Sequence, residues 1–216
     1  MKDIILSGIQ ASGKGTQSRL LLEHFGNQLK YFETGGILRS LQCSDNSIGN
    51  YLKELTKKGL LVNDEVVSGL FGVFMATLEE NDFILGDGCL RKIGQTQQII
   101  EKLRAKKRDF IVINFEITED EVYKRLSSRK ICEKCGKSFS STLDGDFAIC
   151  NLCGWTLIRR NDDENLESIK NRITAFNQDT LPCIEWLRKE GVLVDIDAMK
   201  DPQTIFQEIL HLIGSI

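Results

Sequence analysis

The sequence of 216 residues contains only two histidines, no excess of basic residues and no long apolar run. The histidines, His24 and His211, are isolated, so we expect no histidine-based catalysis. The net charge of −3 gives no general footprint for nucleic acid or anionic membrane, so any bound anion must be met by local charge. No apolar segment has the length of a signal peptide or a membrane span. We therefore expect a cytoplasmic monomer with no nucleic-acid or membrane partner.

What the sequence does contain is an ordinary globular composition, with 41% hydrophobic and 27% charged residues. This composition and length allow a full core, arranged as one domain with an insertion or as two small domains. Short apolar runs alternate with helical patterns along the chain. This order predicts an α/β fold with a central parallel sheet flanked by helices, and a site at the carboxyl ends of the strands.

The first apolar run, residues 4–6, leads into a stretch that is typical of a phosphate-binding loop. Gly8 is followed after four residues by Gly13 and Lys14, and a hydroxyl follows at Thr16. Glycines let successive backbone N–H groups face an anion, Lys14 supplies a point charge, and Thr16 is placed to ligate Mg²⁺. The alternative is a glycine-rich turn that only begins a helix. The predicted ATP ligands in this stretch are Gly13, Lys14, Gly15 and Thr16.

The run Gly-Lys-Gly-Thr-Gln at residues 13–17 resembles the nucleoside monophosphate kinases, among which adenylate kinase fits best. The resemblance continues through essentially the whole chain, motif by motif. It implies a P-loop kinase fold and reversible, Mg²⁺-dependent transfer of a phosphoryl group from ATP to AMP, which gives two ADP. Two alternatives stay open. One is a kinase for GMP, UMP or CMP, and the other is a non-catalytic adenine-nucleotide sensor or zinc-knuckle binding module on the same fold.

A second apolar run, residues 82–86, ends in Asp87 and Gly88, with Arg91 three residues later. An acid at the carboxyl end of a strand beside a phosphate loop can orient Mg²⁺. Arg91 would then lie over the junction of the two nucleotides' phosphates, and Gln95 can offer a donor and an acceptor to a base edge. Each residue taken alone could be a solvated loop residue. The resemblance assigns Gly88, Arg91 and Gln95 to AMP, with Gln95 selecting adenine.

Residues 34–78 are predicted to form the segment that binds the acceptor nucleotide. A short strand ends at Thr34, which by itself would be explained as a helix N-cap. Arg39 follows about one turn later, where a cation is electrostatically misplaced unless it holds an anion. The resemblance assigns Thr34 and Arg39 to the AMP phosphate, and the backbone near Val62 to the AMP base.

Four further arginines are candidates for phosphate contacts. Arg125 and Arg129 lie four residues apart in a predicted helix and so share one face, which could be only a solvated basic face. The resemblance implies that both arginines bind the donor phosphates. It also implies that Arg160 and Arg172 contact the transferred phosphoryl group. Phosphoryl transfer needs positioning and charge neutralisation more than a protein nucleophile. The predicted catalytic residues are Lys14, Asp87, Arg91, Arg125, Arg160 and Arg172.

Four of the seven cysteines form two Cys-x-x-Cys-Gly knuckles, Cys132 with Cys135 and Cys150 with Cys153. Four thiolates can hold one tetrahedral Zn²⁺ with no open position, which makes the metal structural. An insertion of this size cannot build its own core, so the metal would supply folding energy. Disulfides, a redox pair or iron are the alternatives. The resemblance implies the zinc-binding lid of long-form adenylate kinases at 130–157, and a core domain formed by 1–129 and 158–216.

The sequence departs from the family pattern at several of these motifs. Gly36 stands where an acidic residue is more common, and Cys89-Leu90 replaces Phe-Pro in the Asp-Gly-Phe-Pro-Arg motif. One extra residue precedes Arg172, so that Asn171 is a competing position for the catalytic arginine. These departures motivate the sensor alternative.

Overall fold

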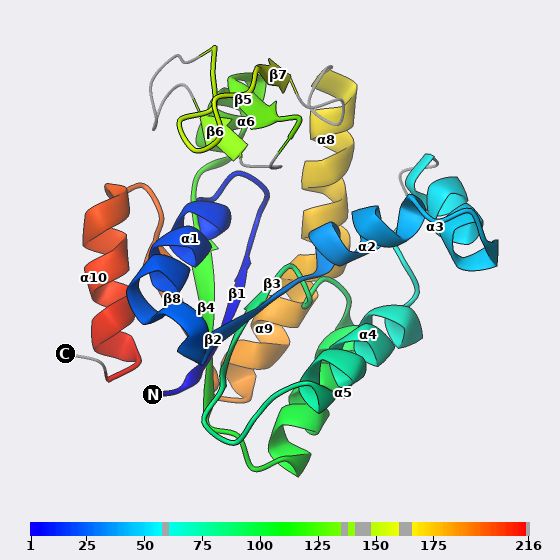
Figure 1. The fold of residues 1–216 in the computed structure, drawn as a ribbon. Helices are drawn as coiled ribbons and strands as arrows, with labels where there is room; N and C mark the ends of the chain where they lie inside the picture. The colour runs from blue at the N-terminus through cyan, green and yellow to red at the C-terminus, as the bar shows by residue number, and fades with distance from the viewer. Residues whose placement is uncertain (58–60, 135–137, 141–147, 160–165, 215–216) are drawn as a thin grey trace.

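The computed structural model describes residues 1–57, 61–134, 138–140, 148–159 and 166–214. Five parallel strands form the central sheet, in the order β2-β3-β1-β4-β8. Figure 1 shows helices on both faces of this sheet, which confirms the predicted α/β fold. The strands are β1 (Asp3–Gly8), β2 (Leu29–Glu33), β3 (Phe83–Asp87), β4 (Phe110–Glu116) and β8 (Leu193–Asp197).

Two helical layers cover the sheet. They are α1 (Lys14–Phe25) and α10 (Pro202–Leu212) on one face, and α4 (Asp64–Ala76), α5 (Ile93–Ala105) and α9 (Leu181–Lys189) on the other. Successive side chains of a strand point to opposite faces, so Ile4 and Leu6 of β1 pack in the first layer's cluster and Ile5 packs in the second. Both faces are therefore buried, which explains why the strands read as continuous apolar runs.

The remaining helices surround the carboxyl end of the sheet, except for the short 3₁₀ turn η1 (Gly26–Gln28) after α1. They are α2 (Thr34–Gln42), α3 (Ser47–Lys57), α6 (Glu119–Ser127), α8 (Leu166–Ala175) and the π-helical turn η3 (Phe176–Thr180). Ile9, just after β1, is buried with Val122 of α6 and Ile169 of α8. This contact holds α6 and α8 beside the predicted phosphate loop. Among the described residues, no helix combines the length and apolarity that crossing a bilayer requires.

A small antiparallel sheet lies apart from the central one, at the top of Figure 1. Its order is β6-β5-β7, with β5 (Arg129–Cys132), β6 (Ser138–Ser140) and β7 (Leu157–Arg159). Its buried cluster consists of Phe139, Leu157 and the cysteines Cys132 and Cys150. Among the described residues of the insertion, Phe139 and Leu157 are the buried apolar side chains besides the cysteines.

The end of α6 corrects one prediction. The helix stops at Ser127, and Arg129 is already the first residue of β5. Arg125 and Arg129 therefore do not share a helix face. Spacing alone cannot show where a helix ends, and the turn at Ser128 lies between the two arginines.

A buried ion pair joins three segments at the amino end of the sheet. The Asp3 side chain is 1% exposed and accepts hydrogen bonds from Ile84 N at 2.9 Å and from Arg108 Nη2 at 2.8 Å. The Arg108 Nε atom also donates to this carboxylate, and Nη2 donates to the Asp82 carbonyl oxygen at 2.6 Å. β1, β3 and the turn before β4 are thus tied together by one guanidinium and one carboxylate.

Candidate active site

The loop between β1 and α1 has the backbone of an anion site. Gly8 has φ +128°, and a Cβ there would lie 2.8 Å from the Phe115 carbonyl oxygen of the neighbouring strand. Gly13, with φ +98°, precedes the first residue of α1, where no side chain caps the helix. The unused N–H groups at this helix start face the loop, as phosphate binding requires. Ala11 is a non-glycine residue at φ +62°, an uncommon conformation for a side chain.

Lys14 is held inside the loop by its own backbone. Its Nζ donates to the carbonyl oxygens of Gly8 at 2.8 Å and Ile9 at 2.7 Å, and to Ser12 Oγ at 3.2 Å. Burial lowers the pKa of Lys14 to about 8, and the negative charge of Asp87 opposes this shift. The half-buried ammonium is therefore a cation whose charged form an incoming phosphate would stabilise.

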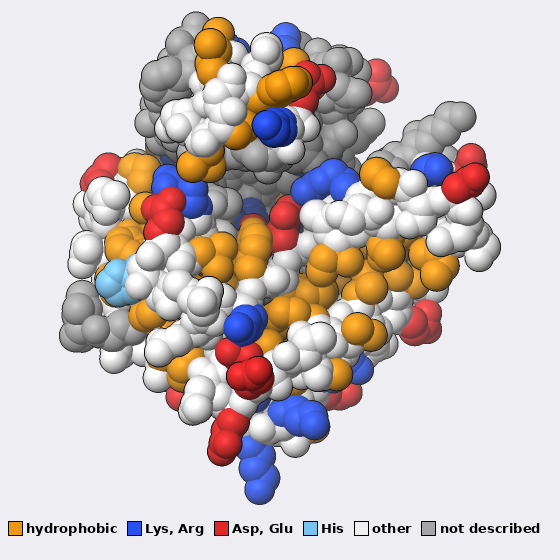
Figure 2. All heavy atoms as spheres, viewed as in Figure 1, with side chains coloured by type: hydrophobic (Ala, Val, Ile, Leu, Met, Phe, Trp, Pro, Cys, Tyr) orange, Lys and Arg blue, Asp and Glu red, His pale blue; other side chains and the backbone are white. Residues whose placement is uncertain are grey.

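Three arginines from separate parts of the chain act on the same ammonium. The charges of Arg91, Arg129 and Arg172 each lower the pKa of Lys14 further. They come from the loop after β3, from β5 and from α8. Arg172 is half-buried whereas Asn171 is exposed, which favours Arg172 as the residue that faces the site. Basic side chains can be seen on both sides of the hollow beneath the small sheet in Figure 2.

Asp87 ends β3 beside this cluster. Burial raises the pKa of its carboxyl group, and the nearby charge of Lys14 lowers it. Its Oδ2 lies 3.4 Å from the hydroxyl of Tyr31, which donates to it from the adjacent strand. The register of β2 and β3 places Glu33 opposite Asp87, so a second acid stands at the same end of the sheet. Tyr31 and Glu33 have no signature in the sequence, because their position at the site depends on which strands are neighbours.

The loop after Asp87 is held by residues on both sides. Thr180 Oγ1 of η3 donates to the Arg91 carbonyl oxygen at 3.1 Å, although these residues are 89 positions apart. Gln95 is 2% exposed, and in the amide orientation that satisfies both groups its nitrogen donates to Cys89 O at 3.1 Å and its oxygen accepts from Lys92 N at 3.0 Å. Gln95 therefore braces the loop where Cys89-Leu90 replaces the family's Phe-Pro. Its contact with an adenine stays a prediction.

On the acceptor side, the N-cap interpretation of Thr34 is wrong. Glu33 occupies the cap position of α2, and Thr34 is the first helical residue. Thr34 is 3% exposed, and its hydroxyl has no hydrogen-bond partner among the described residues. A buried orphan hydroxyl is costly unless a ligand meets it. Arg39 pairs with Glu33 at 2.9 Å, and Val62 packs partly buried against the α4 and α5 cluster.

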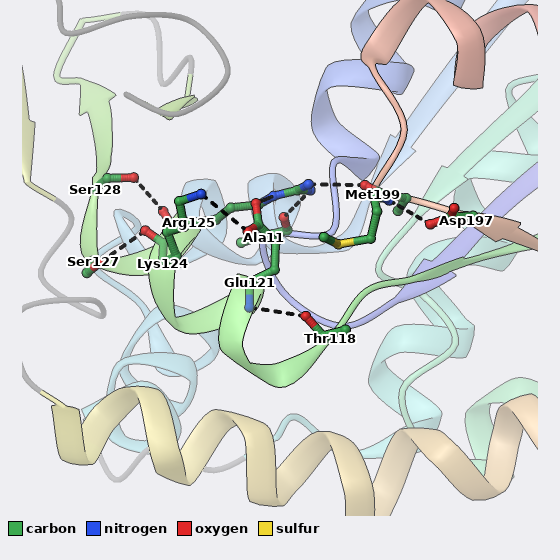
Figure 3. A network of polar contacts seen from close by, with 10 residues as sticks. Ala11, Thr118, Glu121, Lys124, Arg125, Ser127, Ser128, Asp197 and Met199 are labelled. Carbon is green, nitrogen blue, oxygen red and sulfur yellow. Dashed lines mark hydrogen bonds and ion pairs between the residues drawn. The ribbon is translucent and has the colours of Figure 1, made fainter.

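Arg125 makes contacts that were not predicted. Its guanidinium, drawn in Figure 3, donates from Nε to Glu121 Oε1 at 2.8 Å, from Nη1 to Ala11 O at 3.4 Å and from Nη2 to Ala198 O at 3.1 Å. The side chain is 5% exposed. It therefore joins α6 to the phosphate loop and to the loop after β8. A phosphate contact of Arg125 stays a prediction.

The cysteines converge in the small sheet. The sulfur atoms of Cys132, Cys150 and Cys153 all lie within 4.8 Å of one another, and those of Cys132 and Cys153 are 3.4 Å apart. Gly154, with φ +68°, closes the second knuckle through a bond from its N–H to the Cys150 carbonyl oxygen at 2.9 Å. Three convergent thiols suit a tetrahedral thiolate site. Cys135, the fourth predicted ligand, lies outside the described residues, as does Arg160.

The site has a phosphate loop between a parallel strand and a helix, an acid at the end of the adjacent strand of the sheet, and convergent arginines. These features define a P-loop phosphotransferase. The adenylate kinase family model matches residues 6–192. Similar curated proteins include the adenylate kinases of Methanosarcina barkeri, 35% identical with 96% of each chain covered, and Archaeoglobus fulgidus, 33% identical with 99% of each chain covered. That of Syntrophotalea carbinolica is 35% identical, with 98% of each chain covered. The chain belongs to the adenylate kinase family, and it is an ATP:AMP phosphotransferase.

Proposed function

We propose that the cluster around Lys14 carries out transfer of the γ-phosphoryl group from Mg·ATP to AMP. The observation that supports this most directly is that Lys14 Nζ lies inside the phosphate loop, 2.8 Å from Gly8 O and 2.7 Å from Ile9 O, with the charges of Asp87, Arg91, Arg129 and Arg172 near enough to act on its pKa. Lys14 stabilises the negative charge on the β- and γ-phosphates, and the arginines hold the equatorial oxygens of the transferred group. The proposed catalytic set is Lys14, Asp87, Arg91, Arg125, Arg160 and Arg172, with Gly13, Gly15, Thr16 and Arg129 completing the ATP site.

The acceptor nucleotide binds on the opposite side of Arg91. The orphan hydroxyl of Thr34 and the guanidinium of Arg39 receive its phosphate, and the backbone near Val62 receives its base. Gly88, with φ +70°, lets the loop backbone pass beneath Arg91. Gln95 selects adenine when its amide group gives up its hydrogen bonds with the backbone of Cys89 and Lys92 and forms hydrogen bonds with the base instead.

Asp87 and Thr16 hold the Mg²⁺ that accompanies ATP. The carboxylate of Asp87 is half-buried at the end of β3, and the loss of solvent there raises its pKa, so a bound cation stabilises its charged form. Mg²⁺ neutralises and orients the phosphate oxygens when it is bound. Tyr31 fixes the Asp87 carboxylate from the neighbouring strand.

The acceptor is tested by a radiolabelled γ-phosphate transfer assay with Mg·ATP and, separately, AMP, GMP, CMP and UMP. We expect rapid transfer to AMP alone. In Gln95→Ala, whose amide can no longer contact a base, we expect the preference for AMP over the other acceptors to fall by about tenfold. An unchanged preference in this variant would remove Gln95 from base selection. Transfer by the unaltered protein to another monophosphate would overturn the choice of acceptor.

Residues 130–157 act as a lid over the donor phosphates, with Zn²⁺ on Cys132, Cys135, Cys150 and Cys153. The convergence of three of these sulfurs supports the metal, and their burial together with Phe139 and Leu157, in the described part of the lid, supports its structural role. A metal that is bound only by the folded lid contributes its binding free energy to stability.

The proposed protein acts as a cytoplasmic monomer. Its net charge of −3 supports free nucleotides rather than nucleic acid as its partners.

The zinc proposal predicts the behaviour of Cys132→Ser. The variant should retain less than half of the zinc and melt at least about 5 °C lower, because three thiolates hold the metal less tightly than four. Turnover at a temperature where the variant is folded should change little. Zinc is measured by atomic emission and melting by calorimetry, with Cys43→Ser, an exposed cysteine outside the knuckles, as the control. A full zinc content in Cys132→Ser would refute the assignment.

A further inference from the structure

Glu33 is an acid that contacts Arg39, one of the residues predicted to bind the acceptor phosphate. It ends β2, occupies the cap position of α2 and makes no capping hydrogen bond with its side chain. Its carboxylate reaches forward instead, and Oε1 accepts a hydrogen bond from Arg39 Nη2 at 2.9 Å. Both side chains are accessible, with 37% of Glu33 and 54% of Arg39 exposed.

The same carboxylate fills the place beside Gly36. A Cβ added at Gly36 would lie 2.6 Å from Glu33 Oε2, and one added at Gly35 would lie 2.9 Å from Arg39 Nη1. The Glu33–Arg39 pair thus lies directly over two glycines at the start of α2. A side chain at position 36 and the observed position of Glu33 exclude each other. Glycine at this position, where the family more often has an acid, therefore leaves room for the Glu33 carboxylate in its observed position.

We infer that Glu33 is a positioning residue for the acceptor phosphate. From position 33, its carboxylate supplies to Arg39 the negative charge that an acid at position 36 would otherwise supply. The inference rests on the proposed role of Arg39 in binding AMP. Glu33 does not contact the substrate in this account. It fixes the Arg39 guanidinium at the helix start, against Gly35.

The energetics favour an orienting role over a stabilising one. An exposed ion pair contributes at most about 1 kcal/mol to folding, because solvent screens the charges and two side chains lose freedom. A guanidinium has five N–H donors, and the contact with Glu33 uses one of them. The remaining donors can form paired hydrogen bonds with a phosphate, whose geometry depends on how the guanidinium is held. Loss of Glu33 should therefore affect acceptor binding much more than stability.

The test compares Glu33→Ala and Glu33→Gln in steady-state kinetics with each substrate varied in turn. We expect the KM for AMP to rise about tenfold in Glu33→Ala and about threefold in Glu33→Gln, whose amide oxygen can still accept from Arg39. The KM for ATP and the melting temperature should stay close to those of the unaltered protein. The matched control is Glu23→Ala, which removes the carboxylate from another exposed pair, Arg19–Glu23, of the same 2.9 Å length.

A second pair of variants tests whether an acid at position 36 can take the place of Glu33. Gly36→Asp alone should raise the KM for AMP, because its side chain meets the Glu33 carboxylate. Combined with Glu33→Ala, the same substitution should bring the KM for AMP back to within about threefold of the unaltered value, since the acid again faces Arg39 from position 36. A double variant as impaired as Glu33→Ala, with intact melting behaviour, would contradict the exchange of positions.

Arg39→Ala separates failure of this inference from failure of the proposed site. If Arg39→Ala leaves the KM for AMP unchanged, the acceptor site itself is wrongly assigned. If Arg39→Ala raises that KM but Glu33→Ala does not, only the inference fails. A lower KM for AMP in Glu33→Ala would also overturn it, because Glu33 would then compete with the phosphate for Arg39.

Discussion

Replacement of Lys14 by methionine should reduce phosphoryl transfer by roughly a thousandfold or more, because it removes a preorganised charge from the transferring phosphates. Methionine has a similar length and no charge, so it can lie in the same buried space. The hydrogen bonds from Nζ to Gly8, Ile9 and Ser12 are lost as well. Their loss is offset by the removal of a charge that burial disfavours, as the lowered pKa of Lys14 shows. The fold should therefore persist.

The measurement combines a transfer assay with circular dichroism and a melting curve. Lys106→Met, at an exposed lysine after α5, controls for the loss of a positive charge elsewhere and should retain normal turnover. Normal turnover in Lys14→Met would refute the phosphate-loop assignment. A variant that is inactive because it is unfolded would show itself in the melting curve and would be replaced by Lys14→Arg, whose planar guanidinium does not fit the same three acceptors.

The largest expected effect on stability comes from Asp3→Ala, far from the nucleotides. The substitution leaves the Ile84 N–H without its acceptor and the Arg108 guanidinium with only the Asp82 carbonyl oxygen. Removing one partner of a buried pair costs about 3 kcal/mol. The free energy of unfolding, measured by urea denaturation, should fall by about that amount. Asp3→Asn should cost less, because its amide oxygen can still accept from Ile84 N.

Asp109 provides the control for this prediction. It forms an ion pair with Lys2 at 3.9 Å, and its side chain is 73% exposed. Asp109→Ala should change the free energy of unfolding by less than about 0.5 kcal/mol. If Asp3→Ala were as mild as Asp109→Ala, the Asp3–Arg108 pair would not fasten the amino end of the sheet.

Local spacing was enough to predict the central part of this site. The distance from Gly8 to Lys14 and the apolar run before it gave the phosphate loop, and an acid at the end of the next apolar run gave Asp87. These features depend on residues close together in sequence, whose conformations the glycines and the strand pattern largely determine.

The contacts that the sequence could not predict depend on strand order and on loop conformation. Tyr31 meets Asp87 because β2 and β3 are neighbours in register, which the apolar runs do not specify. Thr180 reaches Arg91 from a π-helical turn that has no sequence signature. The role of Glu33 was missed for a related reason. The Glu33 side chain extends over Gly35 and Gly36. A comparison with the family pattern, one position at a time, shows only that glycine replaces the acid at position 36.

The contacts of Arg125 have a mechanical consequence for the small sheet. The phosphate loop at Ala11, helix α6 at Glu121 and the loop after β8 at Ala198 are joined by hydrogen bonds to one guanidinium. Tilting the small sheet by bending α6 would break these bonds. Rotation about the backbone at Ser128, where α6 has ended and β5 has not begun, breaks none of them. We therefore expect that, if the small sheet moves as a lid, the chain bends after Ser127 and the phosphate loop keeps its shape.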